Sequence, residues 1–300
     1  MGTNIENIKS NISLENITFL KCSEVDIDFV YRAFTIGFSD YIVKLEMPKE
    51  VFIHNFFGPE GNDLEISYIA LHENEPVGLV LSGIKNYENM KTIRCGTLTI
   101  HPEYRGTGIS QKLMELHKEE ALRFNCKQMF LEVIVGNDRA INFYKKLGYE
   151  KVYDISYFTK KDLSVFKNSA PNSDCTVSKI SFEQFKEKAQ KWDYHINWQN
   201  DVEFLEKSPN TVYFGAFICG EFVGATAVNP NGKISFIMVD QTYRRKKIAH
   251  ALLFNASKEL DLHAFSAGFP NNNKVEGFFN SLGFNKEKLS QYEMYLPLSK

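Results

Sequence analysis

The 300-residue sequence lacks the features that tie a chain to a membrane or to nucleic acid. No apolar run is long enough to span a bilayer, and the polar, asparagine-rich N-terminus lacks the apolar core of a signal peptide. Gly2 begins no myristoylation site, because Glu6 stands where serine or threonine is required. A formal net charge of −2 gives no general reason to expect a polyanionic partner. We therefore expect a cytoplasmic, soluble protein that binds neither membranes nor nucleic acid.

Cysteine and histidine are too scattered for a disulfide framework or a metal centre. The five cysteines are odd in number and form no C-x-x-C pair, which favours a reducing compartment and excludes the common zinc motifs. None of the seven histidines stands at metal-ligand spacing from another ligand. We predict no metal.

The chain does contain enough apolar material for a sizeable core. Hydrophobic residues make up 43% and charged residues 24% of the sequence, as in soluble globular domains. The length fits one large domain or two ordinary ones. We predict a flexible N-terminal tail at 1–15, domains at 16–160 and 175–300, and a linker at 161–174, where a polar run contains Pro171.

Strand and helix patterns alternate in both domains. In the first we expect strands at 17–21, 66–72, 77–84, 92–100, 128–135 and 150–158, with helices at 26–38, from about 48, at 109–125 and at 138–147. In the second we expect strands at 176–180, 212–218, 222–228, 233–239, 262–267 and from 284, with helices at 182–190, up to 260 and at 273–282.

Two motifs in the first domain return in the second with the same internal spacing. Tyr104-Arg105 matches Tyr243-Arg244, and the segment Asn137–Tyr149 matches Asn272–Phe284 at seven positions. The sequence therefore indicates two copies of one mixed α/β domain.

A glycine-containing loop joins the strand at 92–100 to the helix that starts at Ile109. Gly106 and Gly108 let the backbone approach a ligand closely, and the helix start offers unpaired N–H groups to a phosphate. An ordinary strand-to-helix turn is the alternative that this loop alone leaves open.

Both motifs resemble the GNAT superfamily of acetyl-CoA-dependent N-acetyltransferases. The loop Arg105-Gly106-Thr107-Gly108-Ile109-Ser110 fits the family pattern Arg/Gln-x-x-Gly-x-Gly/Ala, except that Ser110 replaces the final small residue. The second family motif is an Asn, an Ala three residues later, a Phe-Tyr pair and a Leu-Gly-Phe/Tyr end, and Asn137–Tyr149 fits it throughout. The resemblance covers residues 16–160 well and 175–300 weakly.

The resemblance implies a mixed α/β (α+β) fold of two GNAT-like domains. Each would hold a twisted, largely antiparallel sheet with a splayed central pair of parallel strands, flanked by helices. In the first domain the splayed strands would be 92–100 and 128–135, with the pantetheine arm of acetyl-CoA between them.

The same resemblance assigns the acetyl-CoA contacts. The N–H groups of residues 105–110 would bind the pyrophosphate, with charge added by Arg105, and an N–H near Thr99 or Ile100 would polarise the thioester carbonyl. Asn137 would contact the pantetheine arm; a plain helix N-cap is the equally weighted alternative.

Two residues carry the expected chemistry. Tyr144 would donate a proton or a hydrogen bond to the departing thiolate, with a core tyrosine as the alternative. Glu132 is a single glutamate in an apolar strand, at the position where some GNAT members have a general base. A glutamate with a purely structural role is the equally weighted alternative. Asp40, Glu46 and His101 are reserve candidates.

The second domain departs from the family pattern at each chemical position. Lys247 replaces the glycine, Phe279 the tyrosine and Ala267 the glutamate, so we expect a degenerate, non-catalytic copy. The basic run Arg244–Lys247 is better explained as a solvated turn than as a nucleic-acid site. A group of aromatic residues follows the helix at 182–190 and would form core or, alternatively, an acceptor pocket at the domain interface: Trp192, Tyr194, His195 and Trp198.

We predict an N-acetyltransferase whose first domain transfers an acetyl group from acetyl-CoA to a primary amine of a small molecule, by direct attack in a ternary complex. The alternatives are a protein acetyltransferase acting on an N-terminus or a lysine, and a non-catalytic coenzyme A-binding module. Whether the protein forms a homodimer stays open.

Overall fold

The computed structural model describes residues 13–164, 166, 174–192 and 194–298. Most of the predicted N-terminal tail and the centre of the predicted linker lie outside these residues. Within them, no helix has the length and apolar character needed to cross a membrane.

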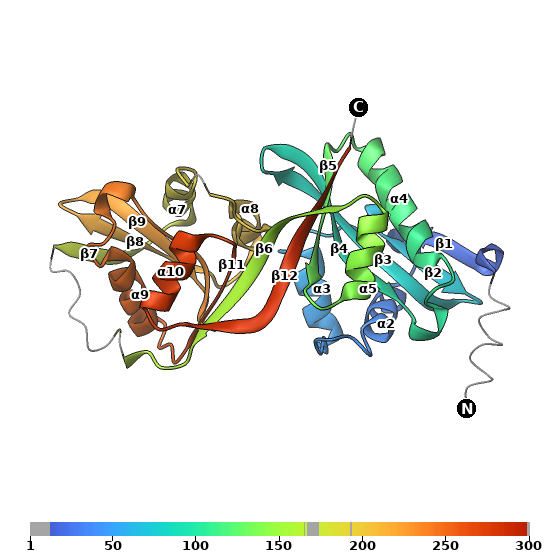
Figure 1. Cartoon of the computed structure of the whole chain (residues 1–300), viewed down its shortest axis with the longest axis horizontal. Helices are drawn as coiled ribbons and strands as arrows, with labels where there is room; N and C mark the ends of the chain where they lie inside the picture. The colour runs from blue at the N-terminus through green and yellow to red at the C-terminus, as the bar shows by residue number, and fades with distance from the viewer. Residues whose placement is uncertain (1–12, 165, 167–173, 193, 299–300) are drawn as a thin grey trace. The chain divides into compact units, whose positions relative to one another are not determined.

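The first compact unit comprises residues 1–152 and 293–300. Its strands follow the order β1-β2-β3-β4-β5-β12. They are β1 (Ile17–Lys21), β2 (Tyr68–His72), β3 (Glu75–Tyr87), β4 (Met90–Ile100), β5 (Gln128–Ile134) and the C-terminal end of β12 (Asn285–Pro297) (Figure 1). The helices are α2 (Ile27–Gly37), α3 (Lys49–Phe57), α4 (Ile109–Arg123) and α5 (Asp138–Lys146).

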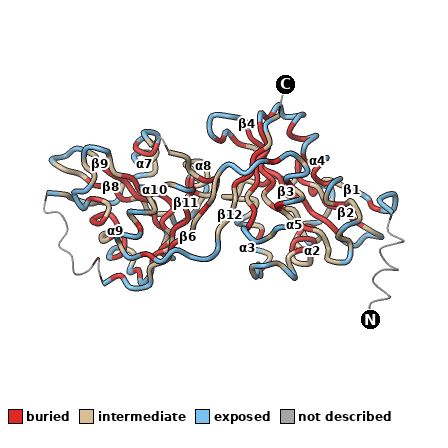
Figure 2. Tube along the Cα trace, viewed as in Figure 1, coloured by how far each residue is buried: buried red, intermediate tan, exposed pale blue. Residues whose placement is uncertain are grey.

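Helices α2 and α4 cover opposite faces of this sheet. A Cβ at Gly37 of α2 would lie 2.3 Å from the Cβ of Thr99 on β4, so the backbone of α2 packs directly against this strand. A Cβ at Gly78 of β3 would instead lie 2.9 Å from Ile109 of α4. On the α2 face, Phe34 and Phe52 pack with ring centroids 4.7 Å apart and are fully buried. Figure 2 shows the buried residues concentrated along the strands.

Strands β4 and β5 run parallel and then separate. Their register runs from Thr92 opposite Gln128 to Cys95 opposite Leu131 and stops there, although both strands continue. A bulge in the pairing of β3 with β4 falls at the same level, where Leu81 and Ser82 face Thr97 and Cys95 and Gly96 is skipped. The predicted splay is confirmed.

The second compact unit, residues 153–292, repeats this plan. Its strand order is β12-β6-β11-β10-β9-β8-β7, where β12 contributes its N-terminal part. Strands β10 and β11 are parallel, and the pairs β6–β11, β10–β9, β9–β8 and β8–β7 are antiparallel. The strands are β6 (Glu150–Lys160), β7 (Cys175–Ile180), β8 (Val212–Ile218), β9 (Glu221–Val228), β10 (Lys233–Val239) and β11 (Phe265–Pro270). The helices are α7 (Phe182–Ala189), α8 (Val202–Lys207), α9 (Ile248–Glu259) and α10 (Asn273–Ser281).

The first compact unit also takes in a short segment from the C-terminal end of the chain. Most of β6 belongs to the second unit, and the last residues of β12 belong to the first. In the first unit β12 pairs with β5, and its Tyr295 ring lies 4.9 Å from Phe130. A strand at this position covers the edge of β5, which would otherwise expose unpaired backbone groups.

His117 links helix α4 to β3 inside the first unit. It is fully buried, its Nδ1 lies 2.7 Å from the Ser82 hydroxyl, and burial lowers its pKa to about 3. Between pH 3 and 6.5 the unfolded chain therefore binds a proton that the folded chain does not, so stability is lost as the pH falls.

We expect this histidine to lower the free energy of unfolding by about 1.4 kcal/mol for each pH unit below 6.5. Urea titrations at pH 7.5, 6.5 and 5.5 on the wild type and on His117→Gln measure it. The wild type should lose more stability than the variant between pH 6.5 and 5.5. Equal losses would show that His117 is not the titrating group.

Candidate active site

The glycine loop between β4 and α4 has the backbone shape expected of an anion cradle. Gly106 and Gly108 have φ angles of 88° and 91°, in the left-handed region that favours glycine. The first intrahelical bond of α4 runs from Lys112 N–H to Gly108 C=O, at 3.1 Å. Among the described residues, the N–H groups of Gly108 to Gln111 have no backbone acceptor. The loop therefore fits a phosphate-bearing ligand such as coenzyme A.

Arg105 is the cradle residue whose position differs most from the expectation. Its guanidinium forms a two-pronged ion pair with Asp40, at 2.5 and 2.6 Å, and donates further hydrogen bonds to the carbonyl groups of Gly37 and Ile100. Its N–H donates to Pro102 at 3.4 Å. This pair holds the pKa of Asp40 below its usual range. Arg105 thus fastens the loop to the end of α2.

Three other predicted loop residues are also held in place. The Thr107 hydroxyl donates to the Tyr104 carbonyl at 2.7 Å, and Ile109 is buried against β3. Ser110 lies in the first turn of α4.

At the splay, the hydrogen-bonding direction distinguishes Ile100 from Thr99. His101 N–H donates to the carbonyl of Val77 on β3, at 2.9 Å. Because N–H groups alternate in direction along a strand, Thr99 N–H faces β3 as well, whereas Ile100 N–H faces the gap toward β5.

Asn137 caps helix α5. Its side-chain oxygen accepts from Ala140 N–H at 3.3 Å. Asn272 caps α10 in the same way, accepting from the N–H of Lys274 and Val275. The capping role left open by the sequence is present in both units.

Tyr144 lies on α5 among other weakly acidic groups. It is 8% exposed, and burial, followed by the neighbouring Cys95, Tyr149 and Tyr41, raises its pKa well above the ordinary tyrosine value. Burial also raises the pKa of the Cys95 thiol to about 12. The tyrosine hydroxyl is therefore protonated throughout the neutral range and can donate a hydrogen bond.

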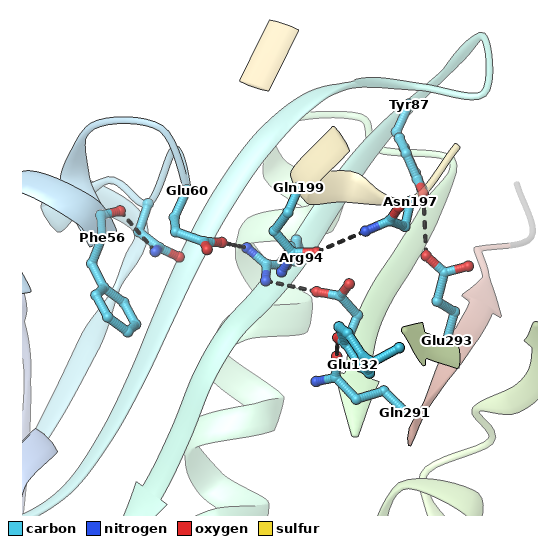
Figure 3. Close-up of polar contacts among 11 residues, drawn as sticks. Phe56, Glu60, Tyr87, Arg94, Glu132, Asn197, Gln199, Gln291 and Glu293 are labelled. Atoms are coloured by element: carbon cyan, nitrogen blue, oxygen red, sulfur yellow. Dashed lines mark hydrogen bonds and ion pairs between the residues drawn. The ribbon is translucent and has the colours of Figure 1, made fainter. Parts of the chain in front are cut away.

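Glu132 belongs to a buried ion cluster that crosses β4 and β5. Arg94 lies between Glu60 and Glu132 and is ion-paired to both, with its Nη2 2.7 Å from a Glu132 oxygen (Figure 3). The side chains of Arg94 and Glu132 are 7% and 3% exposed. Despite its burial, attraction to the two carboxylates raises the pKa of Arg94, so it stays charged. The three groups together carry one negative charge.

Glu60 comes from a loop, residues 58–62, that the sequence did not single out. The loop lies directly on the sheet: a Cβ at Gly83 would come within 2.3 Å of the Gly61 carbonyl, and one at Gly96 within 2.2 Å of Asn62 Oδ1. Asn62 is 6% exposed and anchors the loop by donating to the Phe56 carbonyl. The sequence feature that could have indicated this cluster is Arg94, because it is a charged residue in the strand that neighbours the strand of Glu132.

The reserve candidates do not join this cluster. Asp40 pairs with Arg105, exposed Glu46 pairs with Lys44 at 2.9 Å, and His101 caps the turn before the glycine loop. Across the described residues, no group of three histidine, cysteine, aspartate or glutamate side chains is arranged to hold a metal ion.

The second unit keeps the backbone of the site but carries different side chains. Arg245 and Lys247 have φ angles of 64° and 58°, the same left-handed pattern as Gly106 and Gly108. Arg244 Nε donates to the Val239 carbonyl at 3.1 Å, as Arg105 Nε does to Ile100 at 3.2 Å. Phe279 is fully buried.

Comparison with known proteins agrees with this repeated geometry. Residues 30–149 match the acetyltransferase (GNAT) family, and residues 178–299 match an acetyltransferase (GNAT) domain. The chain belongs to the GNAT acetyltransferase family. This GNAT protein is an acyltransferase with two tandem domains, from a family that uses acetyl-CoA.

Its relatives include protein N-terminal acetyltransferases. The chain is 24% identical over 144 residues to N-alpha-acetyltransferase 30 of Saccharomyces cerevisiae, which covers 46% of this chain and 81% of that protein. It is 28% identical over 148 residues to an N-alpha-acetyltransferase of Sulfurisphaera tokodaii, covering 44% and 86%. A solved tandem GNAT protein from the clavulanic acid biosynthesis pathway shares the fold, with a TM-score of 0.68 at 12% identity, covering 95% and 99%.

Proposed function

We propose that the first unit transfers the acetyl group of acetyl-CoA to a primary amine of a small molecule. The observation that carries this proposal is the meeting of the glycine loop with the gap between β4 and β5, beside Tyr144 and the Glu60–Arg94–Glu132 cluster. Acetyl-CoA supplies an activated acetyl thioester. The free N–H groups at the start of α4 bind its pyrophosphate.

Ile100 is the preferred oxyanion donor. Its N–H faces the gap, whereas that of Thr99 is directed at β3. A backbone donor fixed in a strand needs no reorganisation when charge develops on the carbonyl oxygen.

Tyr144 stabilises the departing thiolate by donating a hydrogen bond. Because burial raises its pKa, full proton transfer to a thiol of ordinary acidity is uphill. A hydrogen bond to the thiolate does not require that transfer.

Glu132 binds the amine and takes its proton. Arg94 is ion-paired to this carboxylate, and the cluster, with two carboxylates to one guanidinium, attracts the ammonium form. Glu60 is ion-paired to the same guanidinium through its other nitrogen, Nη1.

Glu132→Gln should lower kcat/KM for the amine about 100-fold, because general-base catalysis commonly contributes this much. The matched control is Glu60→Gln, which removes the other carboxylate from the same arginine. Initial rates of free thiol release, from pH 6.5 to 9, compare the two. A similar loss in both variants would show that Glu132 acts through charge alone.

A second candidate acceptor is a protein N-terminus, because the sequence relatives are named as N-alpha-acetyltransferases. Assays with small primary amines, and with peptides carrying free or blocked N-termini, separate the two. Transfer to free peptide N-termini but to no small amine would replace our proposal with this one. Acetyl-CoA binding without transfer to any amine would overturn both.

A further inference from the structure

Asn62 places a carboxamide oxygen where the side chain of residue 96 would be. Gly96 lies on β4 and is the residue skipped in the pairing of β3 with β4. A Cβ at Gly96 would come within 2.2 Å of Asn62 Oδ1, which is too close for any real side chain. The glycine therefore leaves room for a polar atom that the 58–62 loop supplies instead of the strand.

This oxygen is buried and accepts no hydrogen bond from the described part of the chain. Asn62 is 6% exposed, and both its Nδ2 and its backbone N–H donate to the Phe56 carbonyl, at 2.9 and 3.0 Å. Because only the nitrogen of the carboxamide can donate to a carbonyl, the Nδ2 bond also fixes which atom faces β4. Buried polar atoms are nearly always hydrogen-bonded, so an acceptor held this firmly points to a donor from outside the chain.

Gly96 and Glu132 lie side by side where β4 and β5 begin to separate. The last parallel pair of these strands is Cys95 opposite Leu131, and Gly96 and Glu132 are the next residue of each strand. Neighbouring strands lie about 4.8 Å apart where they pair. The oxygen that fills the side-chain position of Gly96 therefore lies about one strand spacing from Glu132.

The carboxylate of Glu132 is on the same side of the sheet as this oxygen. Arg94 joins Glu132 to Glu60, and Glu60 comes from the loop that carries Asn62 (Figure 3). A carboxylate and a neutral amide oxygen therefore border one opening at the splay. Two carboxylates to one guanidinium favour a donor that is positive or becomes positive, as an attacking amine does.

We propose that Asn62 selects the acceptor amine: one N–H of the amine faces Glu132, and a second donates to Asn62 Oδ1. This role depends on the acetyl transfer proposed above. When the neutral amine attacks, the nitrogen–carbon bond forms, the carbon–sulfur bond breaks with its electron pair on sulfur, and one proton passes from nitrogen to Glu132. The other N–H stays in the amide product, and Asn62 accepts from it throughout.

This arrangement favours primary over secondary amines. A primary amine has one N–H for each of the two acceptors. A secondary amine has a single N–H, which it gives up to Glu132, so a carbon substituent then lies against the Asn62 oxygen and leaves it unpaired. A site built to hydrogen-bond a substrate group discriminates strongly against an analogue that lacks the group.

Acceptor pairs that differ by one N-methyl group test this selection. Benzylamine is compared with N-methylbenzylamine, and a peptide that begins with glycine is compared with the same peptide beginning with sarcosine. In the pair that it accepts, the wild type should prefer the primary amine by at least about 100-fold in kcat/KM. Equal use of both members would overturn the role of Asn62, whereas no transfer to either primary amine would overturn the proposed function itself.

Asn62→Leu removes the acceptor oxygen at similar side-chain volume and keeps the backbone bond to Phe56. It should lower the preference for the primary amine at least about tenfold, with the KM for acetyl-CoA within about twofold of wild type. Glu60→Gln, in the same loop, is the matched control and should keep the wild-type preference whatever its absolute rates. An unchanged preference in Asn62→Leu would overturn the proposal.

Gly96→Ala reaches the same oxygen from the strand, because the added Cβ must displace Asn62 Oδ1. It should lower the preference as Asn62→Leu does. If Asn62→Leu fails to fold, Gly96→Ala decides alone, and a wild-type preference in that variant would refute the role of Asn62.

Discussion

Gly108→Lys is expected to abolish measurable acetyl-CoA binding by the first unit, a loss of at least about 100-fold. Gly108 is the N-cap of α4, has a φ of 91°, and lies beside the free N–H groups of the first turn. A side chain at this position would stand between those groups and the pyrophosphate. The backbone itself should survive, because Lys247 holds a left-handed φ of 58° at the same position of α9.

Lys247→Gly is the matched control for this substitution. It should leave acetyl-CoA affinity unchanged, and relief of the left-handed lysine should raise the free energy of unfolding by up to about 1 kcal/mol. Calorimetric titration measures the affinities, and urea denaturation measures the stabilities. Unchanged affinity in Gly108→Lys would remove the glycine loop from the coenzyme A site.

The local elements were predictable because each follows from a pattern within a few residues. The boundaries of β1, β8 and β10 coincide with those predicted, and most other elements agree within about three residues. Helix α8 was missed because six residues carry too little periodicity. The fold class could be predicted because the motif Asn137–Tyr149 and its repeat belong to one family.

Pairings across long stretches of chain were not predictable. The end of β12 belongs to the first unit, where the carboxylate of Glu293 accepts from the hydroxyl of Tyr87, 206 positions earlier. A strand pattern specifies which face is buried but not which edge the strand joins. The sequence therefore could not show that the end of β12 joins the edge strand β5 of the first unit.

The same limit applies to the candidate site. Glu132 and Tyr144 could be chosen from their motif positions, but their partners could not. Arg94 reaches Glu60 and Glu132 through side chains from three separate elements. Arg105 was assigned to phosphate from its place in the loop, and its pairing with Asp40 depends on where α2 ends against β4.

The two halves of the chain act as an internal comparison. Both keep the strand splay, the capping asparagine and an arginine whose Nε donates to the end of the preceding strand, so these features belong to the fold. The two halves differ at Gly108 and Lys247, Tyr144 and Phe279, and Glu132 and Ala267. Residues that change while the backbone is kept are the best candidates for chemistry.

Tyr144→Phe follows from this comparison and should lower kcat by about 100- to 1000-fold, with little change in the KM for acetyl-CoA. The lost hydroxyl is the proposed donor to the departing thiolate. The phenyl ring should fit, because Phe279 occupies the matching position of the second unit and is fully buried. Steady-state rates at saturating amine measure kcat. Because the pKa of Tyr144 is raised, deprotonation of this residue should cause no loss of rate up to pH 9 in the wild type.

Tyr149→Phe is the control for removing a buried hydroxyl from the same region. The Tyr149 hydroxyl is buried without a hydrogen-bond partner in the described part of the chain, and Phe284 fills the matching position in the second unit. Its removal should leave kcat within about twofold of wild type and should not lower stability. If Tyr144→Phe retains full kcat, or if both variants lose activity equally, Tyr144 is a core residue and the thiolate is stabilised by another group.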